Sequence, residues 1–288
     1  MSTQQSQSGF RVGTLAVVGV GLIGGSVAAA ARQRGVAERV IGIGRRMERL
    51  EPAREAGLID VCAIDPSAAS EADLTVVCTP VDRIVDDVRA VAAAAQGRML
   101  ITDGGSVKQS ICRRLSRGLP EGVTFVGAHP LAGSEKSGWE HARADLYDGR
   151  ICVVTPEPGA ASDTAVEQTV AFWQALGMRT LQMDPHAHDR SLALTSHLPH
   201  VVASALASLL TEREFELAAT GFRDTTRIAA GDPDLWTAIF LQNAEPVAAE
   251  IDLLIHRLQE FQQSIADGDA EVVRRLLARG KARRDRLS

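Results

Sequence analysis

The sequence predicts a doubly wound α/β domain over residues 12–184, followed by an all-helical domain over residues 185–288. Two observations support this division. From Thr14 onwards, short apolar runs alternate with amphipathic segments, which is typical of parallel strands joined by helical crossovers. After Pro185 the apolar residues keep helical spacing, and no strand pattern competes with them. We therefore place the domain boundary near Asp184.

The expected elements are short and regularly spaced. In the first half we expect strands at residues 15–20, 39–43, 74–78, 99–103, 124–128, 151–155 and 178–183, and helices at 22–34, 47–56 and 162–176. In the second half we expect helices at 188–210, 211–220, 235–265 and 270–284. The strands are expected to be parallel, because parallel neighbours are joined by crossover connections.

Composition places the chain among ordinary globular proteins. Of its 288 residues, 45% are hydrophobic and 23% are charged, and each half is long enough to bury a core. A net charge of −5 argues against a nucleic-acid-binding protein, which usually presents a basic face. No apolar run approaches the roughly 18 residues that span a bilayer, and no signal peptide opens the chain. We expect a cytoplasmic protein that does not contact a membrane, with its four scattered cysteines as free thiols.

The segment from Gly19 to Gly24 is a GxGxxG motif placed directly after a strand and at the start of a helix. Gly19 permits the tight turn, Gly21 lets the backbone approach a pyrophosphate, and Gly24 lets helix and strand pack closely. The phosphates would meet the first helical amides, around Leu22 and Ile23. A glycine turn without a ligand is the alternative, but the position favours a Rossmann-type dinucleotide site.

The end of the second strand bears on the choice of cofactor. An NAD-binding protein usually has Asp or Glu there, which binds the ribose hydroxyls. This sequence has Gly44, Arg45 and Arg46 instead. Guanidinium groups bind a 2′-phosphate that a carboxylate would repel, so we expect NADP to be preferred, with NAD possible. The alternative is that both arginines are solvated loop residues.

Polar residues follow other strands, at the edge where an open α/β sheet binds its ligands. Thr79 and Pro80 end one strand, Asp103 and Ser106 follow another, and His129 ends a third. We expect Thr79, Pro80, Asp103 and Ser106 to line the cofactor. An imidazole at such a position can accept a proton from a hydroxyl, although a structural histidine is an alternative for His129 taken alone.

Several segments share one further pattern. They are DGGSVK at 103–108, HPLAGSEKSG at 129–138, SHLPH at 196–200 and GFRDTTRIA at 221–229, followed by Asp232, Pro233 and Trp236. In this order they resemble segments of the prephenate/arogenate dehydrogenases of tyrosine biosynthesis. The resemblance extends from Thr14 to about Arg257, which is nearly the whole chain.

The resemblance implies an oxidative decarboxylation. Hydride leaves ring C4 for the nicotinamide, the C4 hydroxyl becomes a carbonyl, and the ring loses carbon dioxide and aromatises. His129 would take the hydroxyl proton, and Ser106 would bind near the same oxygen or the histidine. No metal is required, and His197 with His200 lacks a third metal ligand.

The resemblance also indicates how an anionic substrate is held. Arg227 matches the family's carboxylate-binding arginine, and an arginine–carboxylate pair is strong and directional. The other candidate substrate contacts are His200, His197, Glu135, Lys136, Arg223 and Trp236. For His197 and Trp236 a core role is the alternative. In the family the segment around Trp236 comes from the partner subunit, which implies a homodimer.

Other interpretations remain open at this point. A β-hydroxyacid dehydrogenase or imine reductase would share the architecture, but the former carries a lysine base early in its second domain, and here no lysine precedes Lys281 in that half. A regulator that only senses the dinucleotide would not need His129, Ser106 and Arg227 together. Within the family, Glu135, Lys136 and His200 favour prephenate as substrate, with arogenate as the alternative.

Overall fold

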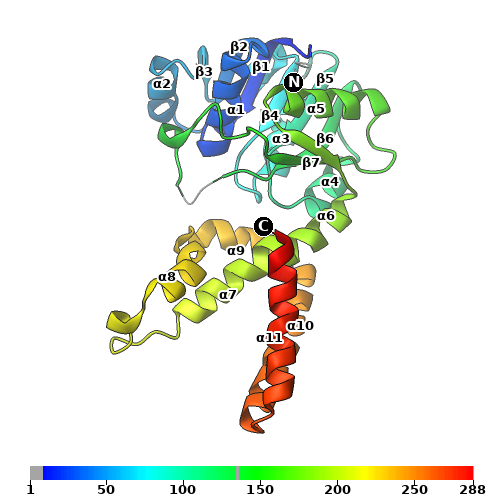
Figure 1. Cartoon of the computed structure of the whole chain (residues 1–288). Helices are drawn as coiled ribbons and strands as arrows, with labels where there is room; N and C mark the ends of the chain where they lie inside the picture. Colours follow the sequence, from blue (N-terminus) through cyan, green and yellow to red (C-terminus); the bar gives the residue numbers. More distant parts are fainter. Residues whose placement is uncertain (1–8, 134–135, 288) are drawn as a thin grey trace, which may run out of the picture.

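A computed structural model describes residues 9–133 and 136–287 (Figure 1). The chain divides into two parts that we call the sheet half, residues 9–183, and the helical half, residues 185–287. Figure 1 shows the helices of the sheet half around a central sheet, with the helical half projecting from one end of it. The part of the chain that the structure describes has no helix long and apolar enough to cross a membrane.

The sheet has eight strands in the order β3-β2-β1-β4-β5-β6-β7-β8. The strand order reverses beside β1, which pairs in parallel with both β2 and β4. This strand order confirms the predicted doubly wound fold class. Ligands of such folds bind at the point where the strand order reverses. The strands are β1 Val12–Val18, β2 Ala37–Ile43, β3 Val61–Ala63, β4 Leu74–Val77, β5 Met99–Asp103, β6 Val123–Pro130, β7 Ile151–Thr155 and β8 Arg179–Gln182.

The expectation of an all-parallel sheet is wrong at β7, which runs antiparallel to β6. The reason lies in the connection, which contains one short 3₁₀ turn, Trp139–His141, where a parallel neighbour would need a full crossover. The chain therefore re-enters the sheet from the edge at which β6 ended, and His129 pairs with Val153. Strand β8 is parallel to β7 and ends beside Val154, level with Ala128. This reversed pair returns the chain to the vicinity of His129.

Helices cover both faces of the sheet because side chains alternate along each strand. Leu15 and Val17 belong to one core, and Ala16 and Val18 to the other. The first core contains residues of α1 and α5, and the second contains residues of α3 and α4. The helices of this half are α1 Leu22–Gln33, α2 Met47–Glu55, α3 Ile84–Ala93, α4 Gln109–Leu115 and α5 Asp163–Ala175.

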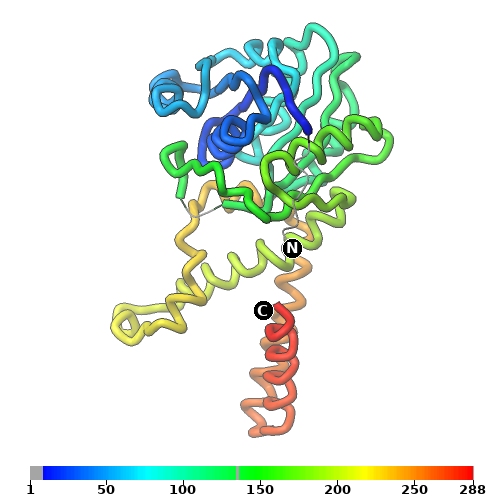
Figure 2. Tube along the Cα trace, turned by 45° about the horizontal axis from the view of Figure 1, so that its top comes forward, coloured from blue at the N-terminus to red at the C-terminus, as the bar shows by residue number. Residues whose placement is uncertain are grey.

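The helical half begins with α6, which Asp184 caps through its side chain and in which Pro185 takes the first position. After a π-helical turn, Ala193–His197, the chain continues as α7. The remaining helices are α7 Leu198–Ala207, α8 Thr220–Thr226, α9 Pro233–Gln242, α10 Ala244–Ala266 and α11 Ala270–Arg284. Figures 1 and 2 show two arms, α7–α8 and α10–α11, that extend away from the sheet.

Two expectations for this half are wrong. Residues 211–220 do not form a helix but turns and a short 3₁₀ segment, Phe215–Leu217. Local side-chain bonding competes with helix formation here, since the Glu214 carboxylate accepts from both the amide and the hydroxyl of Thr211. The single helix expected at 235–265 is broken at Asn243, whose side chain binds neighbouring groups instead of facing solvent.

Candidate functional site

The glycine loop after β1 has the shape that a dinucleotide requires. Gly19 has a φ of +89°, and a Cβ there would lie 2.9 Å from the carbonyl carbon of Cys78. A Cβ on Gly24 would collide with the carbonyl oxygen of Gly19. At Gly21, by contrast, a Cβ would meet nothing within 4 Å. Gly19 and Gly24 therefore permit close packing, while Gly21 leaves open space at the start of α1.

The start of α1 offers hydrogen-bond donors to a ligand. Gly21 is the N-cap residue and has no side chain to cap the helix. The amides of the first turn, which includes Leu22 and Ile23, then suit an anion such as a pyrophosphate. The hydroxyl of Thr79, next to Gly19, is buried without a hydrogen-bond partner in the described residues. These groups fit a bound dinucleotide.

The loop after β2 is open where the adenosine ribose of a dinucleotide would lie. Gly44 is half-buried, and Arg45 and Arg46 are exposed. Arg46 precedes α2 as its N-cap residue without a side-chain bond to the helix. A Cβ on Gly44 would come within 3.2 Å of Cδ2 of Leu50, the end of a flexible side chain. The loop therefore presents two free guanidinium-bearing side chains to solvent and has little room to spare at Gly44.

A buried ion pair holds the loop between β5 and α4. Asp103 and Lys108 are both fully buried, and the carboxylate of Asp103 binds the ammonium of Lys108. The Asp103 carboxylate also accepts from the amides of Gly105 at 3.0 Å and Ala128 at 2.9 Å, and Lys108 Nζ donates to the Ala128 carbonyl at 3.0 Å. Such a pair is tolerable in the interior because hydrogen bonds satisfy it. It fixes the loop that carries Ser106 beside the residue preceding His129.

His129 lies near the carboxyl end of β6, half-buried, with its Nδ1 2.9 Å from Nε2 of His188. Burial lowers the pKa of His129 well below its ordinary value of 6.5, and the neighbouring His188, Lys108 and His197 lower it further. The ring is therefore neutral near pH 7. A neutral imidazole is the form that can accept a proton.

The sequence assigns no catalytic role to His188 or Asp189. Both are fully buried on α6, and Nδ1 of His188 lies 2.7 Å from Oδ1 of Asp189. The adjacency of a histidine and an aspartate just after a helix start was the available signal, but nothing in the sequence places residue 188 beside residue 129. The described residues contain no group of three or more metal-ligating side chains.

His200 and Trp236 form a second cluster, in the helical half. Their rings stack with centroids 3.7 Å apart and an interplanar angle of 14°. A Cβ on Gly231 would lie 2.6 Å from Nε1 of Trp236, so only glycine fits against this pair. His200 is 4% exposed, and its Nδ1 has no hydrogen-bond partner in the described part of the chain. The orphaned nitrogen is suited to a ligand atom.

His197 is bound within the protein. It is buried, and its Nδ1 lies 3.0 Å from Nδ2 of Asn243. Burial lowers its pKa to about 4, against the raising effect of Asp189. His197 is thus a neutral histidine held at the junction of α9 and α10, as the alternative core role predicts.

The cationic candidates are distributed over a wider surface. Arg227 is exposed at the start of a short 3₁₀ helix, Arg227–Ala230, and Arg223 is exposed on α8 with its Nε bonded to the Ala218 carbonyl. Lys136 is exposed, and Glu135 lies outside the described residues. Among the described residues, no hydrogen bond or ion pair joins Arg227 to His129 or Ser106. A Cβ on Gly104 would contact both Ile23 of the cofactor helix and Pro130, so the cofactor loop and the base lie close together within one chain.

The segment that follows His129 lies across the cofactor helix. A Cβ on Gly25 would lie 2.9 Å from Cβ of Ala142, so helix and segment are in close contact. The amide of Arg143 donates to Oγ of Ser26 at 3.0 Å, and the hydroxyl of Tyr147 donates to the Ile23 carbonyl at 2.7 Å. These bonds tie the segment that carries Lys136 to the start of α1.

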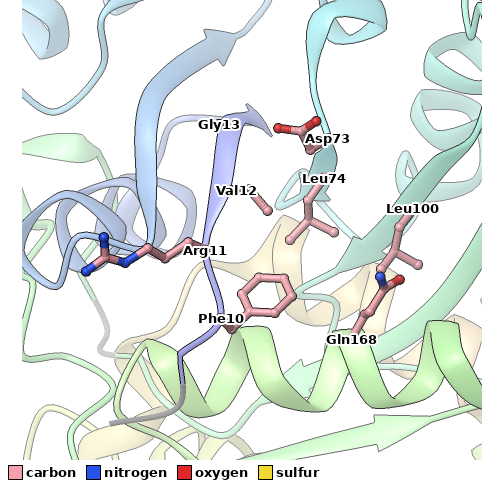
Figure 3. Close-up of a pocket in the computed structure, with 8 residues that line it drawn as sticks. All are labelled: Phe10, Arg11, Val12, Gly13, Asp73, Leu74, Leu100 and Gln168. Atoms are coloured by element: carbon pink, nitrogen blue, oxygen red, sulfur yellow. The ribbon is translucent and has the colours of Figure 1, made fainter.

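A hollow of about 360 Å³ lies at the opposite edge of the sheet (Figure 3). Phe10, Val12, Leu74 and Leu100 line it at the amino ends of β1, β4 and β5. The Asp73 carboxylate beside it accepts from the amide of Thr14 at 2.9 Å. The glycine loop, Ser106 and His129 lie at the carboxyl ends of the strands, so this hollow is not part of the site.

Models of known families match both halves of the chain. One, described as prephenate dehydrogenase, nucleotide-binding domain, matches residues 27–182. The other, described as prephenate dehydrogenase, dimerization domain, matches residues 184–279. Together they cover most of the sequence.

Individual relatives agree with these models. Prephenate dehydrogenase of Bacillus subtilis is 34% identical over 283 residues, which is 95% of this chain and 76% of the relative. Cyclohexadienyl dehydrogenase of Zymomonas mobilis is 34% identical over 89% of this chain and 90% of its own length. The solved structure of Aquifex aeolicus prephenate dehydrogenase with hydroxyphenyl propionate and NAD⁺ superimposes with a TM-score of 0.90 at 29% identity, over 97% of this chain and 100% of that one. Synechocystis arogenate dehydrogenase gives a TM-score of 0.82, also at 29% identity, over 96% of this chain and 100% of its own.

The glycine loop at the switch point and a neutral histidine at the same sheet edge define a nicotinamide-dependent oxidoreductase, with a dimerization domain as its second half. The family models that match both halves narrow this class of enzyme to one family. The chain belongs to the prephenate dehydrogenase family of tyrosine biosynthesis.

Proposed function

We propose that this protein oxidises prephenate to 4-hydroxyphenylpyruvate with loss of carbon dioxide, and that His129 is the general base. The observation that carries the proposal is the position of His129, a half-buried and neutral imidazole at the carboxyl edge of the sheet. The ion pair of Asp103 and Lys108 holds the Ser106 loop beside it. The 12–184 and 185–288 domain division and a cytoplasmic location stay predictions.

The residues divide the reaction between them. A bound nicotinamide supplies the hydride acceptor. His129 takes the proton of the C4 hydroxyl as its oxygen becomes a carbonyl, and Ser106 binds near that oxygen. The carbon–carbon bond to the ring carboxylate breaks and its electron pair enters the ring, so the oxygen takes back a proton as the ring aromatises to the phenol. Aromatisation drives the reaction, and the protein supplies a base and positioning.

The helical half holds the substrate's carboxylates. We assign Arg227 to one carboxylate, since a guanidinium binds a carboxylate through two parallel hydrogen bonds. The orphaned Nδ1 of His200 supports a contact to the substrate. The further candidates for substrate contact are Glu135, Lys136, Arg223, Trp236 and His197. The exposed apolar residues of the two arms support a homodimer, in which Arg227 and the arm of the second copy complete the site.

The cofactor is NADP in preference to NAD. The support is local: the loop after β2 has no carboxylate, and it presents Arg45 and Arg46 to solvent. The Aquifex aeolicus relative was solved with NAD⁺. A preference of this protein for NADP would mean that cofactor choice differs between the two proteins. Gly19, Gly21, Gly24, Thr79 and Pro80 would bind either dinucleotide.

Arogenate is the second candidate substrate, because a prephenate and an arogenate dehydrogenase both superimpose on this chain at 29% identity. The two substrates differ in a keto group and an amino group. Prephenate is favoured by the presence of Glu135, Lys136 and His200, which resemble the prephenate-type members of the family.

Steady-state kinetics with both substrates and both cofactors test these proposals together. We expect NADPH formation with prephenate, and a higher kcat/KM for prephenate than for arogenate. A higher value for arogenate would reassign the substrate while keeping the chemistry. Absence of turnover with either substrate would overturn the proposed function.

A further inference from the structure

A continuous line of hydrogen bonds leads from the proposed base into the helical half. Nδ1 of His129 lies 2.9 Å from Nε2 of His188, and Nδ1 of His188 lies 2.7 Å from Oδ1 of Asp189. His188 and Asp189 are fully buried, so these bonds do not compete with water. The proposed reaction uses only the first of the three residues.

Asp189 is fixed as an acceptor. Its Oδ1 accepts from the amide of Lys108 at 2.8 Å, and its Oδ2 from the amide of Gln109 at 2.9 Å. Backbone amides can only donate, and a carboxylate offers only acceptors. The Asp189 carbonyl in turn accepts from Nδ2 of Asn243 at 2.8 Å, which fixes the residue from the α9–α10 junction.

The direction of each hydrogen bond then follows from the valence of a neutral imidazole, which has one donor and one acceptor nitrogen. Since Asp189 accepts, Nδ1 of His188 carries the hydrogen and its Nε2 is an acceptor. Since Nε2 of His188 accepts, Nδ1 of His129 must donate. The remaining nitrogen of His129, Nε2, is left with a free lone pair.

We propose that His188 and Asp189 are positioning residues that hold His129 in the tautomer whose Nε2 is unprotonated, and that this atom takes the proton from the substrate. This inference rests on the proposed function of His129 as base. During the reaction the hydroxyl proton moves from substrate oxygen to Nε2 of His129, and Nδ1 keeps its hydrogen. The resulting imidazolium donates to His188, and the Asp189 carboxylate stabilises the positive charge through it.

The charges around the pair agree with this assignment. Burial lowers the pKa of both His129 and His188, so both rings are neutral at pH 7. Lys108 lowers both pKa values, while Asp189 and Asp103 raise that of His188. The carboxylate of Asp189 is thus the negative group in direct contact with the line, since that of Asp103 is bound to Lys108.

The tautomer can be measured without substrate by ¹⁵N NMR of the full-length protein labelled at its histidines. The His129 signals are assigned by their loss in His129→Asn. We expect the resting enzyme to carry the His129 hydrogen on Nδ1. A hydrogen on Nε2 would overturn the proposal, whatever the protein does with prephenate.

Two substitutions extend the test to turnover. Asp189→Asn replaces an acceptor-only group by one that can also donate, which permits the opposite tautomer. We expect a fall in kcat of about 10²–10⁴ with KM within a few-fold, and a shift of the His129 hydrogen towards Nε2. His188→Gln keeps an acceptor and a donor and should retain more activity than His188→Leu. Equal activity of the two His188 variants, or wild-type kcat in folded Asp189→Asn, would overturn the positioning role.

His186→Gln is the matched control, because His186 lies on the same helix and is exposed, with its Nδ1 3.2 Å from Oε1 of Gln109. It should leave kcat, KM and the His129 signals unchanged. If the wild type turns over neither candidate substrate, the proposed function fails, but the tautomer is still determined.

Discussion

The sheet half and the helical half bury their residues to different extents. In α1, seven of twelve residues are buried. The structure describes every residue of α10 and α11. Of the 23 residues of α10 only Val247 and Ser264 are buried, and none of the fifteen residues of α11 is buried. The sheet half therefore has its core within one chain, whereas the arms of the helical half need a second surface. The same division applies to function, because the cofactor loop and base lie in the sheet half, whereas Arg227 and Arg223 lie in the helical half.

The sharpest test of this division is His129→Asn. If the sheet half supplies the chemistry, kcat should fall by about 10²–10⁴ while KM for prephenate changes little, because a general base acts in the transition state. Steady-state kinetics measure both. A variant with near-wild-type kcat would show that the base lies elsewhere.

Arg227→Ala tests the corresponding role of the helical half. A hydrogen bond to a charged group contributes about 1.5–3 kcal/mol, so KM for prephenate should rise by roughly 10- to 150-fold. The affinity for NADP, measured by fluorescence titration, should be unchanged. Arg223→Ala is the control, since its Nε is already bonded to the Ala218 carbonyl, and we expect a smaller effect. Equal losses for cofactor and substrate would contradict the division.

Arg45→Ala combined with Arg46→Ala tests whether the sheet half alone selects the cofactor. The preference for NADP over NAD, as a ratio of kcat/KM values, should fall by at most roughly 10- to 150-fold. Solvent screening weakens the attraction of these exposed guanidinium groups for the phosphate and makes the fall smaller. Gly44→Asp should reverse the preference by adding repulsion and a ribose acceptor. A wild type that favours NAD would contradict our interpretation of this loop.

Leu253→Glu tests whether the arms need a partner. Leu253 is 59% exposed on α10, and burying a leucine contributes about 1.5–3 kcal/mol, so the dimer should dissociate at least about tenfold more readily. Sedimentation equilibrium measures this. Ile64→Glu is a matched control, because Ile64 is also 59% exposed but lies in the sheet half. A stable, active monomer of the wild type would exclude the dimer altogether.

The smallest effect concerns pH. Burial lowers the pKa of His129 below 6.5, with contributions from His188, Lys108 and His197, and the neutral ring is the active form. The kcat/KM for prephenate should therefore fall less than about twofold between pH 7 and pH 6, where a histidine of ordinary pKa would lose about threefold. An acid limb centred near 6.5 would show that His129 is solvated.

The sequence was sufficient for features that depend on local chemistry. The strands at 99–103 and 151–155 have the predicted bounds, and the glycine loop lies between strand and helix as expected. These features follow from apolar runs and from the steric needs of glycine. Strand β3, with three residues, was missed because so short a run has no periodicity.

Features that depend on tertiary contacts could not be predicted. The direction of β7 is absent from its own sequence, since alternation is the same for either orientation. The proximity of His188 to His129 depends on that direction, because the reversed pair β7–β8 delivers α6 to this edge. The supposed helix at 211–220 failed for a related reason: Leu217 is 77% exposed, so no packing overrides the local bonds of Thr211.

The place at which the chain leaves the sheet has a mechanical consequence. Strand β8 ends level with Ala128, and α6 begins three residues later at Pro185. This connection is the covalent pivot between the halves. In a rigid rotation, each atom moves in proportion to its distance from the pivot. His188 lies about one helical turn from it, whereas Arg227 follows only after α7 and α8 along the chain. Any motion of the helical half about this connection would therefore displace His188 little, which keeps the base and the groups that orient it in register with the sheet.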